Sequence, residues 1–234
     1  MSDWDKAMAE RIGAAVKARR SELGWTAARL SDETERLHHP VHRVAIGKLE
    51  NGHRGAKFEV AELVVLAKAL GVPPMLLLYP DMPGGDVEVL PRVHTNSFAA
   101  ARWFSGEDTL AWYLPTPESH PDLDRRAGAY YDGATLEEWH DGAKPLILAR
   151  DEEALWERLR HNENRERQLV DSLRANPDDK TTQELIGFVQ KSIQETKDEI
   201  GKVRVRQREG GSATIALSPR YSDIDERGET NGEA

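Results

Sequence analysis

The chain has 234 residues, 31% of them charged, a mean hydropathy of -0.65 and no cysteine. These values exclude disulfides and thiolate metal sites, and no apolar run approaches the roughly 18 residues that a membrane-spanning helix needs. Residues 1–5 also lack the basic-then-apolar plan of a signal peptide. We therefore expect a cytoplasmic protein without membrane association, whose stability comes from packing alone.

The formal net charge of -9 is distributed unevenly along the chain. Residues 1–80 contain 12 Lys and Arg against 10 Asp and Glu, whereas residues 81–234 contain 20 against 31. The first segment therefore has a net charge of +2 and the second a net charge of -11. Because a polyanion is attracted by positive charge and repelled by negative charge, only the first segment is suited to face nucleic acid.

Five short helices are predicted in residues 1–80, because apolar residues recur there at helical spacing. The predicted helices cover residues 12–23, 27–37, 41–51, 58–70 and 73–78. Thr26 stands where the second helix needs an N-cap, and Pro40 requires a turn before the third helix begins. Gly52 and Gly71 are suited to the left-handed conformation that ends a helix.

Residues 81–150 give weaker signals, because prolines and glycines interrupt every long pattern. The elements predicted here are a strand at 87–90, a helix at 97–104 and extended pieces at 110–114 and 146–148. Aromatic side chains are rare in disordered linkers, yet this segment contains several. They are Trp103, Phe104, Trp112, Tyr113, Tyr130, Tyr131 and Trp139. We expect the segment to connect two domains and its aromatic residues to form a small core rather than a ligand cage.

Residues 151–208 show a heptad rhythm, which predicts two coiled-coil helices joined by a turn at 176–179. Folded back antiparallel, the helices would form a regular seam. Its pairs are Leu173 with Ile186, Leu169 with Val189, Glu166 with Ile193, Asn162 with Thr196, Leu159 with Ile200 and Leu155 with Val203. Asn162 and Thr196 would form a polar layer that fixes the pairing. A two-helix core is thin, so we expect this hairpin to form a homodimer, and residues 209–234 are predicted to be disordered.

Several short motifs in residues 10–80 follow one another in a recognisable order. They are Leu23-Gly24-Trp25-Thr26, Leu30, the run from Val41 to Gly52 with its Ile46-x-x-Leu49-Glu50-Asn51-Gly52 pattern, Leu63, and the run from Leu66 to Val72. In this order the sequence resembles the lambda-repressor-like, Xre-type helix-turn-helix regulators, including actinobacterial members with an appended C-terminal region. The expected fold class is therefore mainly α, with a five-helix DNA-binding domain, an irregular mixed middle segment and a C-terminal antiparallel coiled-coil hairpin.

The resemblance implies that residues 41–51 form a recognition helix, which must bury one side against its domain and present the other to the major groove of DNA. Ile46 and Leu49 would supply the buried side. The outward residues would be Arg43, Val44, Gly47 and Lys48. The arginine and the lysine could donate to guanine, and the valine could contact a thymine methyl group.

The resemblance also implies contacts to the neighbouring phosphates, through backbone N–H groups, a helix dipole and cationic side chains. The residues in these positions are Thr26, Asn51, Arg54 and Lys57, and His42 at the turn is a further expected contact. Arg20 and Glu50 occupy places where similar domains form an internal ion pair. The chain departs from the family at Ala27, where a long polar residue often touches DNA, and in residues 30–41, which are longer than in the shortest members.

We expect a double-stranded DNA-binding transcription regulator, a repressor that acts as a homodimer, with no enzymatic activity, catalytic residue, metal or cofactor. The alternative is a protein-interaction adaptor of the phage or toxin-antitoxin type, which would use the same domain and hairpin to bind a protein partner. The histidines at 38, 39, 42 and 53 match no metal-site spacing. The Glu137-Glu138 and His140-Asp141 pairs come with no recognisable nucleophile or pocket, so a surface loop explains them.

Overall fold

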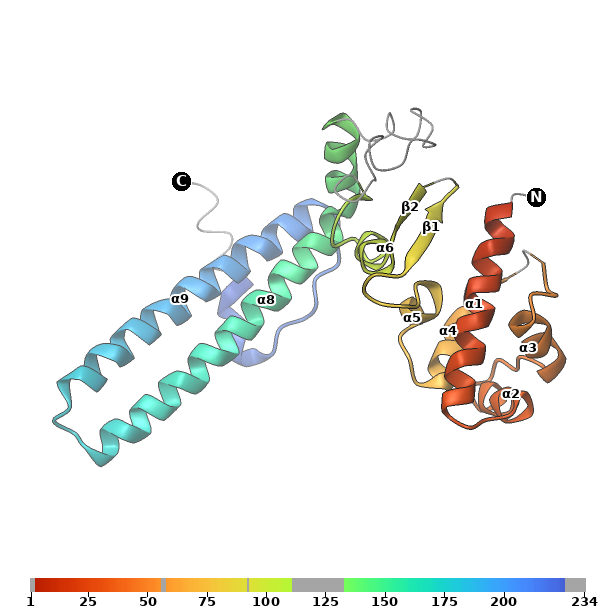
Figure 1. Cartoon of the computed structure of the whole chain (residues 1–234). Helices are drawn as coiled ribbons and strands as arrows, with labels where there is room; N and C mark the ends of the chain where they lie inside the picture. Colours follow the sequence, from red (N-terminus) through yellow and green to blue (C-terminus); the bar gives the residue numbers. More distant parts are fainter. Residues whose placement is uncertain (1–2, 56–57, 92, 111–132, 226–234) are drawn as a thin grey trace. The chain divides into compact units, whose positions relative to one another are not determined.

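The computed structural model describes residues 3–55, 58–91, 93–110 and 133–225. The chain divides into two compact units, Met1–Glu137 (unit 1) and Glu138–Ala234 (unit 2). The described residues are mainly helical, with one small two-stranded sheet in unit 1 (Figure 1). None of the helices in these ranges is long and apolar enough to cross a membrane.

Unit 1 begins with five helices, as the sequence predicts. They are α1 (Asp3–Glu22), α2 (Ala27–Arg36), α3 (Arg43–Glu50), α4 (Val60–Leu70) and α5 (Pro74–Leu78). The hydroxyl of Thr26 caps α2 by accepting a hydrogen bond of 3.1 Å from the backbone N–H of Arg29. Gly71 ends α4 with a φ of 65°, a conformation that glycine adopts without steric cost. The first helix is longer than predicted, since it starts at Asp3.

The core of unit 1 joins the five helices through side chains that are almost fully buried. They include Ile12, Val16, Leu30, Ile46, Leu49, Leu66 and Leu70. Helices α1 and α3 are in close contact at Gly13, where a Cβ atom would lie 2.2 Å from the carbonyl oxygen of Leu49. Only glycine fits at this point, so the backbone of α1 fixes the position of α3.

Residues 81–110 are part of unit 1 rather than a separate linker. Strands β1 (Asp86–Leu90) and β2 (Val93–Asn96) pair antiparallel, with Val87 opposite Thr95, and α6 (Ser97–Phe104) follows. Their buried residues, among them Val87, Val89, Val93 and Ala100, extend the core of the five helices. The indole N–H of Trp4 in α1 donates to the carbonyl of Glu88 at 3.2 Å.

These elements test several predictions for the middle segment. The strand at 87–90 and the helix at 97–104 are confirmed, whereas β2 was not anticipated. Two of the aromatic residues pack within unit 1. Trp103 packs against its core, and the ring of Phe104 meets that of Tyr79 edge to face. Leu110, the first residue of the extended piece predicted at 110–114, is fully buried. The rest of that piece lies outside the described residues, and so do the aromatic residues at 112, 113, 130 and 131.

Unit 2 is built on two long helices, α8 (Gly133–Ala175) and α9 (Lys180–Glu209), which run side by side and are joined by a short turn (Figure 1). The extended piece predicted at 146–148 is wrong, because α8 continues through it with Pro145 inside the helix. Proline removes one backbone donor and disfavours a helix. Packing outweighs this local preference, since Leu148 is 6% exposed and its carbonyl accepts a hydrogen bond from the amide of Gln207 in α9.

Several of the predicted seam residues are buried between the helices, but the polar pair predicted across the seam differs. Leu159, Val189, Ile193 and Ile200 form the buried cluster between the helices. The polar layer of Asn162 with Thr196 is wrong. The amide of Asn162 donates to the hydroxyl of Ser192 at 3.0 Å, and the hydroxyl of Thr196 accepts from Arg158 at 3.1 Å. A heptad pattern defines which face is buried, whereas the axial stagger depends on such individual polar contacts.

The prediction that residues 209–234 are disordered is wrong for residues 212–225, which pack against the helix pair. Residues 212–225, here called the strap, return along the helix pair and contain the short helix η2 (Pro219–Tyr221). Ile224 is fully buried, and the ring of Tyr221 packs edge to face on Trp156 with centroids 5.0 Å apart. The composition of residues 209–234 as a whole, rich in glycine, serine and glutamate, hides this anchor, because only a few residues of the strap carry the contacts.

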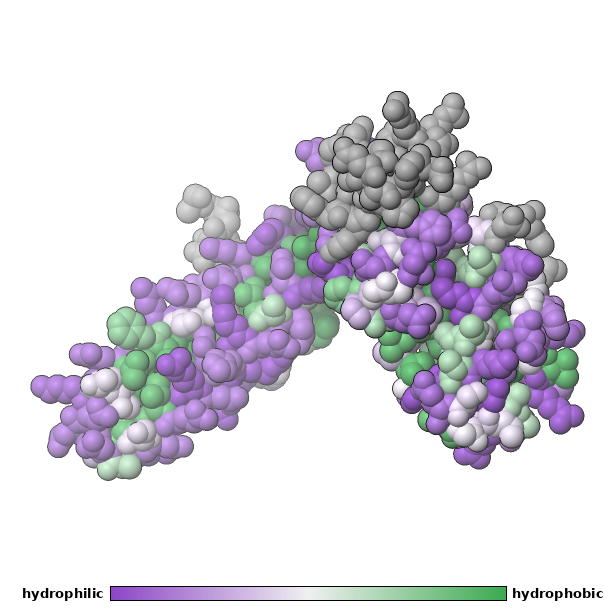
Figure 2. All heavy atoms as spheres, viewed as in Figure 1, coloured by the Kyte–Doolittle hydropathy of each residue, from purple (hydrophilic) through white to green (hydrophobic). Residues whose placement is uncertain are grey.

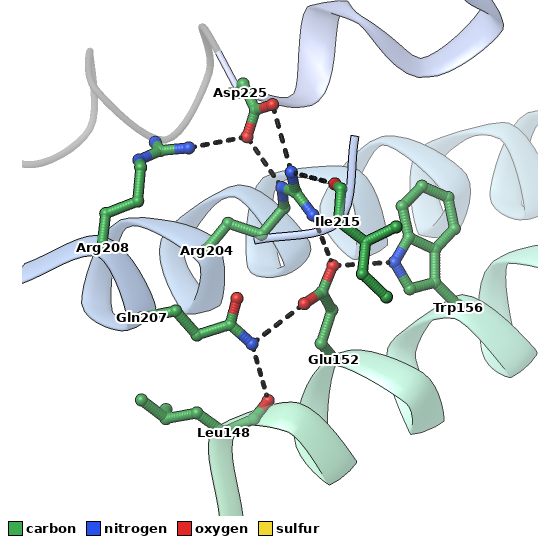
Figure 3. A network of polar contacts seen from close by, with 8 residues as sticks. All are labelled: Leu148, Glu152, Trp156, Arg204, Gln207, Arg208, Ile215 and Asp225. Carbon is green, nitrogen blue, oxygen red and sulfur yellow. Dashed lines mark hydrogen bonds and ion pairs between the residues drawn. The ribbon is translucent and has the colours of Figure 1, made fainter. Parts of the chain in front are cut away.

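Arg204 of α9 holds the strap against the helix pair (Figure 3). Its side chain is only 2% exposed, and its guanidinium donates to Glu152 at 2.8 Å and to Asp225 at 2.7 Å. A third group, the carbonyl of Ile215, accepts at 2.8 Å. The buried cation is therefore compensated from α8 and from two points on the strap, as a buried charge must be.

Candidate nucleic-acid interface

Helix α3 has a buried side and an open side. Ile46 and Leu49 are 0% and 1% exposed and belong to the core of unit 1. Arg43 and Lys48 are exposed on the other side, and 53% of the surface of Val44 is accessible. Among the described residues, Arg43 and Lys48 have no ion-pair partner. The open side therefore presents two uncompensated cations and an apolar side chain.

The C-terminal end of α3 is tied to α1 by Arg20 and Glu50. Two parallel hydrogen bonds join them, from Nε to Oε1 at 2.6 Å and from Nη2 to Oε2 at 2.8 Å. The remaining Nη1 donates to the carbonyl of Trp25, just before α2. The hydrogen bond with Glu50 raises the pKa of Arg20, so the guanidinium stays charged. One side chain thus links α1, the start of α2 and the end of α3.

The N-terminal end of α3 is set by a buried hydroxyl that sequence reasoning missed. Thr34 of α2 is fully buried, and its Oγ1 accepts from the backbone N–H of Val41 at 2.9 Å and donates to the carbonyl of Ser31 at 2.8 Å. This contact anchors the long connection between α2 and α3, in which His38 has a φ of 61°. The only sequence signal was a threonine on an otherwise apolar helical face.

His42 is exposed and caps α3, because its Nδ1 accepts a hydrogen bond of 3.2 Å from the backbone N–H of Val44. This acceptor role requires an Nδ1 without a proton. The side chain predicted to contact a phosphate is therefore the same one that caps the N-terminus of α3. Within the described ranges, His42 and the neighbouring histidines form no cluster with other potential metal ligands.

Gly47 lies in the middle of α3, and no contact among the described residues requires a glycine there. A Cβ atom built on Gly47 has no neighbour within 4 Å, in contrast to Gly13, whose Cβ would collide with α3. Glycine costs a helix about 0.5–1 kcal/mol relative to alanine. The open space over Gly47, between Val44 and Lys48 on the helical surface, allows an external molecule to approach the backbone of α3 closely.

The predicted phosphate contacts have different surroundings. Asn51 is exposed, and its side-chain amide donates to the carbonyl of Gly47 at 2.8 Å. Arg54 instead forms an ion pair of 2.6 Å with Glu62, and these side chains are only 21% and 12% exposed. The hydroxyl of Thr26 is occupied by its N-cap bond, and Lys57 lies outside the described residues.

A further cation, Arg29, was not singled out from the sequence. It lies in the first turn of α2, and its guanidinium stacks over the ring of Trp25 at 5.6 Å. Glu33 accepts from both Arg29 and Arg36, at 2.6 and 2.8 Å, so one carboxylate partly compensates two cations. Arg43 and Lys48 therefore remain the uncompensated charges closest to the start and end of α3.

Comparison with known protein families, with curated proteins and with solved structures gave no match for this chain.

Proposed function

We propose that the protein is a sequence-specific double-stranded DNA-binding transcription regulator, and that residues 1–80 form a lambda-repressor-like, Xre-type helix-turn-helix domain. In this proposal α3 enters the major groove. Repression is the simplest mode of action, since occupancy of an operator is sufficient for it.

The open side of α3 carries the proposal. Arginine and lysine donors recognise the O6 and N7 atoms of guanine, and an exposed valine suits the methyl group of thymine. Arg43, Lys48 and Val44 offer these groups from a helix whose opposite side is held by the core. The open space over Gly47 suits the close approach of a base edge.

The proposal includes a homodimer formed through unit 2. A single small domain makes few contacts to DNA, whereas two linked copies gain from their high effective concentration and read a two-fold symmetric site. Residues 81–234, which include the second part of unit 1, have a net charge of -11 and would be repelled by the phosphates, so residues 1–80 are the part suited to contact DNA.

The test is the selection of bound sequences from a random pool of double-stranded DNA by the full-length protein. Enrichment of one motif is expected. Arg43→Ala should then reduce the preference for one base pair by about 1–3 kcal/mol. Lys57→Ala should instead weaken binding to all DNA sequences alike and reduce the salt dependence of the binding constant. Arg174→Ala is the matched control, because Arg174 is 77% exposed in unit 2 and carries the same charge.

The second candidate function is the protein-interaction adaptor. It is favoured by one observation, the large apolar side chain of Phe188 in unit 2, which is 72% exposed. An adaptor would return no enriched DNA motif in the same selection, so that result would exclude the regulator and support the adaptor.

A further inference from the structure

Among the described residues, one face of α9 has no packing partner. The side of α9 that packs in unit 2 contains Thr182, Val189, Ile193 and Thr196. At 100° per residue, the opposite side near the turn contains a second set of residues. They are Lys180, Glu184, Gly187, Phe188, Lys191 and Glu195, here called the outer face of α9. Figure 2 shows hydrophobic side chains reaching the surface near the turn end of this helix pair.

Two residues of the outer face are unfavourable in an isolated chain. Phe188 leaves 72% of its surface exposed to water. Gly187 lies inside the helix, where it costs about 0.5–1 kcal/mol, and a Cβ atom on it would meet nothing within 4 Å. Packing within the described residues explains neither the exposure of Phe188 nor the glycine at position 187. A large aromatic side chain therefore lies next to an unoccupied surface site.

The outer face is complementary to a second copy of itself. If two α9 helices pack antiparallel about a two-fold axis between residues 187 and 188, Phe188 of each copy lies over Gly187 of the other. The same alignment places Glu184 opposite Lys191, and Lys180 opposite Glu195. A symmetric interface requires such self-complementarity, because each contact occurs twice.

We propose that two copies of this protein associate through the outer face of α9 in this antiparallel alignment, with the Phe188 ring of each copy seated on Gly187 of the other. The inference rests on the homodimer in the proposed function and gives that dimer its surface. The interface is only about four helical turns long, so association in the micromolar range is expected rather than a permanent dimer. The ion pairs at its edges add orientation more than affinity.

The charges of the outer face are free to make these contacts. The intrahelical pair of Lys191 with Glu195 is 3.8 Å long, and its side chains are 75% and 60% exposed, so it can rearrange at little cost. Among the described residues, Glu184 and Lys180 have no ion-pair partner. Each copy contributes four charged side chains, and each of them would face an opposite charge of the other copy. The dimer would therefore contain four intermolecular ion pairs.

Sedimentation equilibrium of the full-length protein at micromolar concentrations tests this surface. Phe188→Glu should raise the dimer dissociation constant by about thirtyfold or more, since aromatic residues dominate such interfaces. Phe98→Glu is the matched control, because Phe98 is 51% exposed in unit 1, and it should leave association unchanged. Gly187→Leu should also weaken the dimer by filling the site of the ring, although leucine favours the helix.

Charge reversal gives an independent readout of the alignment. Glu184→Lys and Lys191→Glu should each weaken association about three- to tenfold, because either change creates two like-charged pairs per dimer. The double variant should restore wild-type association, and far-ultraviolet circular dichroism checks that each variant is folded. A protein that dimerises equally well with Phe188→Glu, or whose double variant shows no rescue, would overturn the inference. So would a monomeric wild type that captures another protein through this face.

The outcome separates this inference from the proposed function. A monomeric wild type that still selects one DNA motif would overturn the α9 contact and leave DNA recognition standing. A dimer that depends on Phe188 but selects no motif would support the contact and overturn the regulator.

Discussion

Arg20 of α1 and Glu50 at the end of α3 form a doubly hydrogen-bonded ion pair whose side chains are only 15% and 5% exposed. The pair ties the open side of α3 to the first helix. With the close contact at Gly13, it leaves α3 little freedom to rotate about its axis. The direction of Arg43 and Lys48 therefore follows from contacts on the buried side of the same helix.

Glu50→Ala should destabilise unit 1 by about 3 kcal/mol, because it leaves the Arg20 guanidinium buried without its carboxylate. Urea unfolding followed by circular dichroism measures the loss. The control is Glu22→Ala: Glu22 forms a comparable pair with Arg19, but its side chain is 64% exposed, so a change below about 0.5 kcal/mol is expected. Equal losses in both variants would show that the Arg20 pair is not structural.

Gly47→Ala should have opposite effects on folding and on DNA binding. Alanine should stabilise α3 by about 0.5–1 kcal/mol, since its Cβ meets no atom of the described residues within 4 Å. The added methyl group should nevertheless weaken binding to the selected DNA. Thermal unfolding and a fluorescence-anisotropy titration measure the two effects. Gly13→Ala is the contrasting variant and should destabilise the fold, because its Cβ would lie 2.2 Å from the carbonyl oxygen of Leu49.

Thr34→Val should cost about 1–3 kcal/mol of stability, because it leaves the buried N–H of Val41 without an acceptor while keeping the shape of the side chain. Thr34→Ser keeps the hydroxyl and should recover the hydrogen bond, at the cost of one methyl group. If the lost contact also loosens the start of α3, hydrogen exchange at residues 41–44 should accelerate in Thr34→Val alone. Unchanged exchange would show that the turn is held by other contacts.

The sequence was sufficient for the elements that obey local rules. Helical spacing, the cap at Thr26 and the stop at Gly71 located five helices, and the family resemblance implied that Arg43 and Lys48 lie opposite Ile46 and Leu49, as they do. These signals lie within a few residues of the feature that they predict. The pairing of Arg20 with Glu50 came from family resemblance, since no local pattern connects residues 30 positions apart.

The failures share a physical cause, which is that long-range packing outweighed local preference. Pro145 predicted a break, but the burial of Leu148 carries α8 through it. Residues 209–234 suggested disorder because glycine, serine and glutamate are frequent among them, although the buried Ile224 and the ion pair of Asp225 with Arg204 hold the strap. The predicted seam of unit 2 paired Asn162 with Thr196 from heptad spacing, whereas the side chain of Asn162 instead bonds to Ser192, which spacing alone does not reveal.

The strap should be released by acid but not in the neutral range. The hydrogen bond from Arg204 lowers the pKa of Asp225, despite a smaller opposing effect of burial. Burial raises the pKa of Glu152, but hydrogen bonds from Arg204, Trp156 and Gln207 outweigh it, so the net shift is also downward. A carboxyl whose pKa is lower in the folded state stabilises that state above its unfolded pKa of about 4, and this contribution is lost as the pH falls through the folded value.

The strap contact should therefore be constant from neutral pH to about pH 4 and weaken below it. The fluorescence of Trp156, which Tyr221 covers, reports this release when the other five tryptophans are replaced by phenylalanine. Asp225→Asn should open the strap already at neutral pH and flatten the acid transition, because an amide cannot compensate the charge of Arg204. Asp171→Asn is the control, since Asp171 is 70% exposed in its pair with Arg174, and its acid transition should match that of the parent protein. A transition that is unchanged in Asp225→Asn would assign the acid response to other carboxylates of unit 2.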